Sequence, residues 1–334
     1  MSLKSLVLAA ASALIYLPTS TGLATGMQAA TYLEYADAAY SLVDSYTASN
    51  FFSEFSLFSG GDPTNGFVNY QGSLSAAQSA GLVNTNNNQI YMGVDHTTVN
   101  PSSPGRASVR LTSNKAYTHG LFIADIAHMP GSICGVWPAF WLFGPNWPNS
   151  GEIDIIEGVN QASTDQITLH TAAGCTINTA GSQSGITLTN SNCNAGNAGD
   201  GCGVTTSMPN AYGDSFNNNG GGTYAMQWES SGIYVWFWPA GSVPSDVTSG
   251  QPVTGNWGLP VVAFNGGSGC TIDNFFSDQS IVFDTTFCGS WAGAVWSSGS
   301  CSSYADTCAD YVSGNPGAFT NAYWLVNSVK VYQQ

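Results

Sequence analysis

The chain carries little charge, and positive charge is the scarcest kind. Only five of its 334 residues are Lys or Arg, against 20 Asp or Glu, so the formal net charge is −15. A chain this negative repels nucleic acids and anionic lipid surfaces, which excludes both as partners. A neutral or cationic substrate is compatible with this charge.

Long apolar runs are also lacking. The one extended run covers residues 6–17, after Lys4 and before a stretch of small residues, an arrangement typical of a secretion signal. It is too short to cross a membrane as a helix. We therefore expect a signal peptide over residues 1–29, and a secreted, soluble monomer whose single domain spans residues 30–334, with no membrane partner.

A helical composition is missing as well. The 39 glycines, 12% aromatic residues and only 7% charged residues are typical of an all-β protein with many turns. Alternation of apolar and polar residues predicts strands over residues 121–128, 137–143, 153–157, 167–171, 224–228, 233–238 and 324–332.

The eight cysteines show none of the two-residue spacing of a structural zinc site. An even count in an exported chain predicts four disulfides, whose pairing the sequence leaves open. Cys301 and Cys308 are close enough in sequence to staple one loop. Residues 174–222 are rich in Gly, Asn, Ser and Thr and contain three cysteines, so we interpret them as a stapled surface insertion.

What stands out against this background is the run Gly-Glu-Ile-Asp-Ile-Ile-Glu-Gly at residues 151–158, which holds two of the chain's five glutamates. Its aliphatic residues predict a buried or half-buried strand, where an acidic side chain is costly unless it has a partner or a task. A Ca²⁺-binding patch is the alternative, but such loops are built from Gly, Asn and Asp and not from isoleucines.

On a regular strand Glu152 and Asp154 share a face, and Glu157 points the other way. A β-bulge at Ile155 or Ile156 would bring Glu157 to the face of the other two. Two carboxyls about 5 to 5.5 Å apart form the machinery of a retaining glycosidase. Glu152 would be the nucleophile, Asp154 would orient it, and Glu157 would be an acid/base whose pKa is raised by its anionic neighbours and by burial.

These residues resemble a known catalytic signature. Glu152-Ile-Asp154-Ile-Ile-Glu157 is similar to the bulged motif of glycoside hydrolase family 16, and residues 137–160 resemble those of its fungal endo-1,3(4)-β-glucanases, the laminarinases. The resemblance extends more weakly from about residue 40 to residue 331. It implies a concanavalin-like β-jelly-roll sandwich with a sugar-binding cleft across its concave sheet, and the same three catalytic roles.

A glucan cleft needs exposed tryptophans, because aromatic rings stack on the apolar faces of sugars. Trp147, in the loop before the motif, is the first candidate. Trp141 is the second, with Trp137 on the same face by parity, although core packing is the alternative for each. The resemblance points to Trp291 as a distal-subsite tryptophan, with Trp257 as an equal alternative.

His170 and Arg110 complete the candidate site. The resemblance puts His170 near the scissile sugar, where it supports Asp154 or contacts the leaving group; a histidine bonded within the sheet is the alternative. Either Arg110 or Arg106 would bind glucose hydroxyls in a donor subsite, and a structural salt bridge is the alternative.

Three other functions are alternatives to this one. A serine hydrolase is excluded, because no Gly-x-Ser-x-Gly elbow is present. A lectin on the same fold would bind glucan without cutting it, and a transglycosylase would pass the covalent intermediate to a sugar. The sequence predicts a retaining endo-β-glucanase that binds β-glucan and cuts β-1,3 bonds, and also β-1,4 bonds next to a 1,3-linked residue. No cofactor is expected, and no ligand set for a structural Ca²⁺ stands out.

Overall fold

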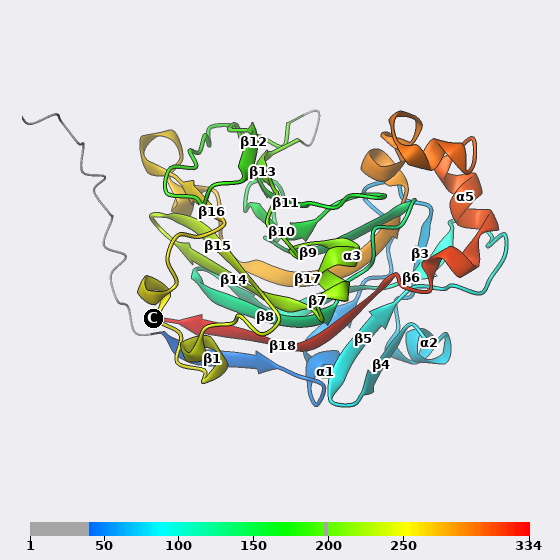
Figure 1. The fold of residues 1–334 in the computed structure, drawn as a ribbon, viewed down its shortest axis with the longest axis horizontal. Helices are drawn as coiled ribbons and strands as arrows, with labels where there is room; N and C mark the ends of the chain where they lie inside the picture. Colours follow the sequence, from blue (N-terminus) through cyan, green and yellow to red (C-terminus); the bar gives the residue numbers. More distant parts are fainter. Residues whose placement is uncertain (1–39, 197–199) are drawn as a thin grey trace, which may run out of the picture. The chain divides into compact units, whose positions relative to one another are not determined.

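Alternation of inward and outward side chains builds two large antiparallel sheets in the computed structural model, which describes residues 40–196 and 200–334. The predicted signal peptide lies outside the described residues. Each sheet has eight strands. In Figure 1 the sheets form two layers, with β14, β8 and β18 in one and β10, β9 and β17 in the other.

The first sheet contains, in spatial order, β16 (Val262–Asn265), β15 (Gly232–Pro239), β14 (Gly222–Glu229), β8 (Gly120–His128), β18 (Tyr323–Gln333), β5 (Gln89–Gly93) and β4 (Val83–Asn86), with β1 (Ser41–Tyr46) paired to β18. The second contains β12 (Ile186–Asn190), β13 (Cys202–Thr206), β11 (Asp165–His170), β10 (Glu152–Glu157), β9 (Val136–Phe143), β17 (Gln279–Phe287), β7 (Arg110–Tyr117) and β2 (Phe55–Leu57). A small parallel pair joins β3 (Val68–Tyr70) and β6 (Arg106–Ser108).

Helices are short and lie outside the sheets. The α-helices are α1 (Phe51–Glu54), α2 (Leu74–Ser79), α3 (Gly213–Asn218), α4 (Ser245–Thr248) and α5 (Cys308–Gly314). A single π-turn, η4, covers Gly289–Gly293, and 3-10 turns cover Thr254–Asn256, Gly267–Gly269, Ile272–Asn274, Trp296–Ser298, Ser300–Ser303 and Pro316–Phe319. Within the described ranges, no helix is long and apolar enough to span a membrane.

The core lies between the two sheets. One face of each strand supplies it with large apolar side chains, including Phe122 and Ile126 from β8, Met226 and Trp228 from β14, Phe140 and Leu142 from β9, and Ile153 and Ile156 from β10. Burial of such side chains is worth about 1.5–3 kcal/mol each relative to exposure, so this contact sets the registers of the strands. The opposite face of the second sheet is thereby left for function.

A smaller apolar cluster sits at one end of the second sheet. It combines residues from the segment after β17 with residues from earlier strands such as β3 and β9, and it holds two disulfides, Cys134–Cys301 and Cys288–Cys308. The other two disulfides are Cys175–Cys270 and Cys193–Cys202. The prediction of four bridges is confirmed, but the prediction that Cys301 and Cys308 staple one loop is wrong, because each reaches back to a strand end instead.

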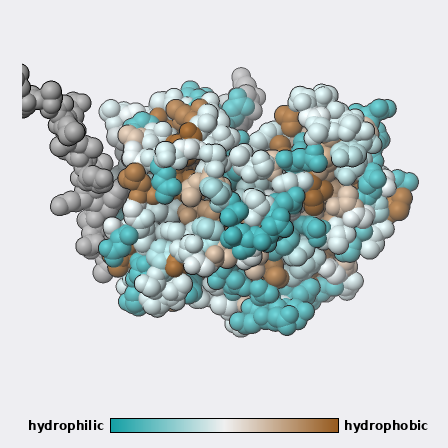
Figure 2. All heavy atoms as spheres, in the orientation of Figure 1, coloured by the Kyte–Doolittle hydropathy of each residue, from teal (hydrophilic) through white to brown (hydrophobic). Residues whose placement is uncertain are grey.

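All seven predicted strands are present, with ends that differ by no more than two residues from those expected. The jelly roll of two packed antiparallel sheets is confirmed. The interpretation of residues 174–222 as a surface insertion was too simple, since β12 and β13 lie within them and extend the second sheet beyond β11. Figure 2 shows the surface hollowed between this edge and the lobe around α5.

Candidate active site

A bulge in β10 aligns the three acidic residues of the motif. Asp154 lies opposite Trp141 on β9, and the next pair is Ile156 with Phe140, so Ile155 is the extra residue. The predicted bulge is therefore present, at the first of the two positions named for it. Because a bulge places two residues against one, Glu152, Asp154 and Glu157 lie opposite Phe143, Trp141 and Ala139, alternate residues that share one face of β9.

These carboxyl groups hold their protons more tightly than exposed carboxyls do. Burial, and after it the charge of Asp154, raises the pKa of Glu152 to about 8, and the side chains that oppose this rise are His170, Trp147 and Arg110. Burial raises the pKa of Glu157 well above its usual range, with Asp154 as the second cause. The pKa of Asp154, which is 2% exposed, is raised well above its usual range by burial and by Asp284.

His170 on β11 faces this cluster. It pairs with Glu152 across the strands, and its Nε2 lies 3.2 Å from Asp154 Oδ2 and 3.8 Å from Glu152 Oε1. Its buried Nδ1 has no hydrogen-bond partner in the described part of the chain, so the two carboxyls on the neighbouring strand are its polar contacts there. The structure thus brings His170 to the carboxyls that it was predicted to assist.

The same three side chains could also hold a metal ion. One ligand atom from each of Glu152, Asp154 and His170 lies within 4.8 Å of the others. An imidazole with two carboxylates suits a transition metal better than Ca²⁺, which takes six to eight oxygen ligands. The cluster therefore does not match the Ca²⁺ patch that was the alternative for this motif.

Two tryptophans adjoin Glu157. The indole Nε1 of Trp137 donates a hydrogen bond to Glu157 Oε1 (2.8 Å), which opposes the rise of the Glu157 pKa. Trp291 packs edge to face on Trp137, with 5.5 Å between ring centroids. Trp137 was expected only to share the face of Trp141, and its direct bond to a motif carboxylate is a finding of the structure.

Trp141 belongs to a second polar cluster on the same face. Its Nε1 donates to Asp284 Oδ1 (3.1 Å), and the guanidinium of Arg110 lies over its ring at 4.7 Å. Tyr70 donates to the other oxygen of Asp284 (3.0 Å). Burial raises the pKa of Asp284 to about 6, although Arg110 and these two donors oppose the rise.

Sequence reasoning missed Asp284. The available signal was a lone acidic residue inside the apolar run of residues 281–287, the same kind of anomaly that identified the motif. Asp284 pairs with Ala139 on β9 and with Arg110 on β7, so it lies in line with Glu157 across the sheet.

The other candidates divide between the site and the scaffold. Trp147 is 48% exposed in the loop between β9 and β10, and its side chain opposes the rise of the Glu152 pKa. Trp257 is only 8% exposed and packs on Trp236 and Trp238, on the outward face of β15 in the other sheet, so it is not brought to the motif.

The two candidate arginines, Arg106 and Arg110, have different surroundings. Arg106 is fully buried and pairs with Asp95 (3.1 Å), while its other donors reach backbone carbonyls, so the structural alternative applies to it. Arg110 packs against the rings of Phe58, Trp141 and Phe143, and its buried Nε has no hydrogen-bond partner among the described residues.

Comparison with known proteins agrees with this geometry. Residues 55–332 match the family described as the XgeA-like, catalytic GH16 domain. A protein of Aspergillus niger named "probable endo-1,3(4)-beta-glucanase" is 46% identical over 305 residues, which is 89% of this chain. The chain spans only 40% of the length of that relative.

Two solved structures are similar over their whole length. One is an elongating GH family 16 β-1,3-glucosyltransferase, 44% identical over 88% of this chain with a TM-score of 0.81. The other is laminarinase 16A of Phanerochaete chrysosporium, 43% identical over 89% of this chain with a TM-score of 0.81, which holds 6-O-glucosyl-laminaritriose in its donor and acceptor sites. With its jelly roll and its family match over most of the sequence, this chain belongs to glycoside hydrolase family 16.

Proposed function

We propose that this chain is a secreted, retaining endo-β-glucanase that cuts β-1,3 bonds, and β-1,4 bonds next to a 1,3-linked residue. The observation that carries the proposal is the bulge at Ile155, which puts Glu152, Asp154 and Glu157 on one face of the second sheet. The names of the relatives support a β-glucan substrate. The four disulfides support secretion, because such bonds persist in oxidising compartments.

The two glutamates have complementary roles in this mechanism. Glu157 donates its proton to the glycosidic oxygen while a carboxylate oxygen of Glu152 attacks the anomeric carbon, which forms a covalent glycosyl-enzyme. Glu157 then takes a proton from the water that releases the sugar. His170 contacts both Glu152 and Asp154, and together His170 and Asp154 orient the nucleophile during both steps.

The electrostatics favour this division of labour. Three neighbours oppose the rise of the Glu152 pKa, namely His170, Trp147 and Arg110, and we propose that Glu152 loses its proton before Glu157. A negative Glu152 then keeps the proton on Glu157, because two anions on one face repel each other. The mechanism requires Glu152 ionised and Glu157 protonated, and because the pKa of Glu152 is about 8, the share of enzyme in this form grows as the pH rises toward that value.

Aromatic side chains and Arg110 would bind the glucan. Trp147 is exposed beside Glu152 and offers a ring for stacking. Trp141 bonds to Asp284 on the same sheet face, and Trp291 packs on Trp137, which bonds to Glu157. Arg110 lies over three aromatic rings and would offer its guanidinium N–H groups to sugar hydroxyls.

Transglycosylation is the second candidate, because a solved β-1,3-glucosyltransferase is 44% identical to this chain. The same covalent intermediate would then pass to a sugar instead of water. A non-catalytic glucan-binding protein is the third.

Product analysis separates the three. The protein is incubated with laminarin, lichenan, xyloglucan, cellulose and a β-1,3-oligosaccharide of defined length. Hydrolysis yields new reducing ends and shorter products from laminarin and lichenan. Products longer than the starting oligosaccharide without new reducing ends would instead establish the transferase. Retention on laminarin with no new product would contradict both enzymatic functions.

A further inference from the structure

Asn160 connects the catalytic strand to the tryptophans beside it. It lies three residues after Glu157, where the chain leaves β10, and its backbone has φ +55°. Among residues with a side chain, Asn is one of the few that adopt this left-handed conformation readily. The turn therefore aims a carboxamide, which has both a donor and an acceptor, back across the end of the sheet.

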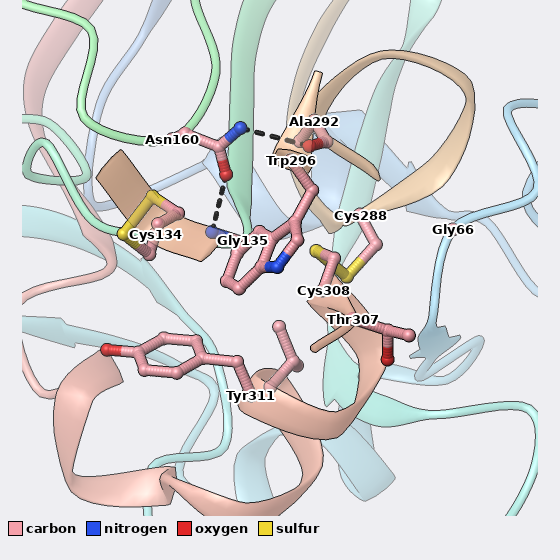
Figure 3. The surroundings of a disulfide bond; sticks show 12 residues. Gly66, Cys134, Gly135, Asn160, Cys288, Ala292, Trp296, Thr307, Cys308 and Tyr311 are labelled. Carbon is pink, nitrogen blue, oxygen red and sulfur yellow. Dashed lines mark hydrogen bonds between the residues drawn. A yellow bond between two sulfur atoms is a disulfide. The ribbon is translucent and has the colours of Figure 1, made fainter. Parts of the chain in front are cut away.

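Three hydrogen bonds of Asn160 join three segments. Its backbone N–H donates to Val136 O (2.9 Å), and its Oδ1 accepts from the Gly135 N–H (2.8 Å). Its Nδ2 donates to Ala292 O (2.9 Å), within the π-turn η4. Figure 3 shows the carboxamide between Gly135 and Ala292, with one bond to each.

Each segment that Asn160 reaches carries a residue of the candidate site. Val136 precedes Trp137, and Ala292 follows Trp291. Trp291 packs on Trp137, and Trp137 donates to Glu157 Oε1. These contacts form a ring of interactions. Asn160 links the end of β10 to the π-turn, and Trp291 and Trp137 link the π-turn back to Glu157 on β10.

The two segments that the Asn160 side chain bonds to, at Gly135 and Ala292, each lie next to a disulfide. Gly135 follows Cys134, which is bonded to Cys301, and the π-turn starts after Cys288, which is bonded to Cys308. The Cys288 N–H also donates to Gly135 O (2.9 Å). Figure 3 shows both bridges around Asn160. The disulfides hold the tryptophan segments to the scaffold, and the Asn160 side chain links those segments to the catalytic strand.

We propose that Asn160 is a positioning residue that holds the Trp291–Trp137 pair so that Trp137 donates to Glu157. It acts through these rings and touches no substrate. The inference rests on the proposed function, in which Glu157 is the acid/base. Loss of the Asn160 side chain would let the π-turn and Trp137 shift, and would leave the Glu157 carboxyl poorly aimed at the leaving oxygen.

The test compares two substrates that differ in their need for acid. A β-1,3-glucan has a poor leaving group and needs protonation, whereas an aryl β-glycoside of a β-1,3-linked glucose oligosaccharide has a good leaving group and does not. Asn160→Gly keeps the left-handed turn and removes both side-chain bonds. We expect kcat/KM to fall about tenfold on the glucan and less than about twofold on the aryl glycoside. Asn160→Asp, which loses the bond to Ala292 O, should behave like Asn160→Gly.

Three comparisons make the result decisive. Asn100→Gly makes the same change at another left-handed Asn, whose Oδ1 accepts from Ser313 (3.2 Å), and both activities should stay unchanged. Trp137→Phe, which removes the donor to Glu157 Oε1, should reproduce the selective loss, and the double variant Asn160→Gly/Trp137→Phe should lose no more than the worse single variant. The ratio of the two activities does not depend on the fraction of folded protein, so partial misfolding cannot imitate the result.

Glu157→Gln separates failure of this inference from failure of the proposed function. It should show a larger selective loss on the glucan than Asn160→Gly does. If Glu157→Gln is selective but Asn160→Gly lowers both activities equally, Asn160 is only structural and the inference is overturned. If Glu157→Gln is itself unselective, the acid/base role is wrong and the proposed function fails with it.

Discussion

Glu152, the proposed nucleophile, is a buried carboxyl whose pKa is set by opposing neighbours. Burial alone makes its charge costly, and Asp154 adds to that cost. His170, Trp147 and Arg110 all favour the charged form, and they approach from three elements, β11, the β9–β10 loop and β7. The charged form of Glu152 is therefore supported by side chains from three separate parts of the chain.

Replacement of this residue gives the most direct prediction. Glu152→Ser should lower glucan hydrolysis by a factor of ~10³ or more, because no other side chain can form the covalent intermediate. The fold should persist, since the carboxyl lies on the face away from the core. Azide or formate should restore part of the activity by entering the space of the lost carboxylate, as followed by product release.

Glu54→Ser is the matched control, because Glu54 is an exposed glutamate on α1. It should leave activity and the thermal midpoint unchanged. Hydrolysis by Glu152→Ser above a few per cent of the starting rate, in a preparation shown to be free of unmutated protein, would rule out Glu152 as the nucleophile.

At this scale, prediction from the sequence succeeded where a residue type is costly in its local pattern. The motif acids stood out because they interrupt an aliphatic strand. Arg106 and Arg110 could not be told apart, since their difference lies in Asp95 and in three aromatic rings from other parts of the chain. Trp257 was equally ambiguous, because sequence position does not reveal which sheet a loop covers.

Among the elements, the bulged strand β10 decides the stereochemistry of the proposed reaction. With Ile155 bulged, Glu152 and Glu157 project from the same face. Carboxyls about 5 to 5.5 Å apart leave no room for water between carboxylate and sugar, whereas inverting enzymes keep them roughly 6.5–9.5 Å apart.

The first-formed product should therefore keep the β configuration. Reducing-end signals of fresh product are followed by NMR before mutarotation, with laminarin as substrate and with an inverting glucanase of known outcome as the reference. An initial α-anomer would contradict the mechanism. It would also mean that the bulge serves a purpose other than pairing two glutamates.

Element prediction worked for strands with strict alternation and failed for the rest. The first group includes β8, β14 and β18, which are bounded by turns. β17 was missed although it lies beside β9, because its run of Ile, Val, Phe, Asp and Thr is buried on both faces and does not alternate. β12 and β13 were hidden by a composition typical of loops. β13 becomes a strand by pairing with β11, and β12 by pairing with β13, next to the disulfide Cys193–Cys202.

At the scale of the whole molecule, buried acids and net charge act in the same direction. The pKa values of Glu152 and Asp165 are raised to about 8 and that of Asp284 to about 6, in each case chiefly by burial. In the unfolded chain these groups titrate near pH 4. Between about pH 4 and pH 8 the folded state therefore binds more protons, so its stability is greatest at the acid end and falls as the pH rises. Self-repulsion of a chain with net charge −15 adds to this trend.

Asp165 isolates the contribution of a single buried acid. It is fully buried on β11, and its oxygens accept from the Glu157 N–H (2.9 Å) and from Tyr224 (3.1 Å). Asn in its place keeps an acceptor for the Glu157 N–H and cannot ionise. At pH 8 we expect the free energy of unfolding of Asp165→Asn to exceed that of the unmodified protein by ~2 kcal/mol, and its unfolding temperature to be higher. At pH 4 the two proteins should be equally stable.

Thermal midpoints measured from pH 4 to pH 8 test this, with Asp125→Asn as the control. Asp125 is an exposed strand residue on β8 that accepts from Asn327 (2.9 Å), so this variant makes the same replacement of Asp by Asn without removing a buried acid. It should retain the full slope of stability against pH, whereas Asp165→Asn flattens it. An equal slope in both variants would assign the pH dependence to net charge alone, and a midpoint that rises toward pH 8 would contradict the burial argument itself, because only a folded state richer in protons loses stability as protons are withdrawn.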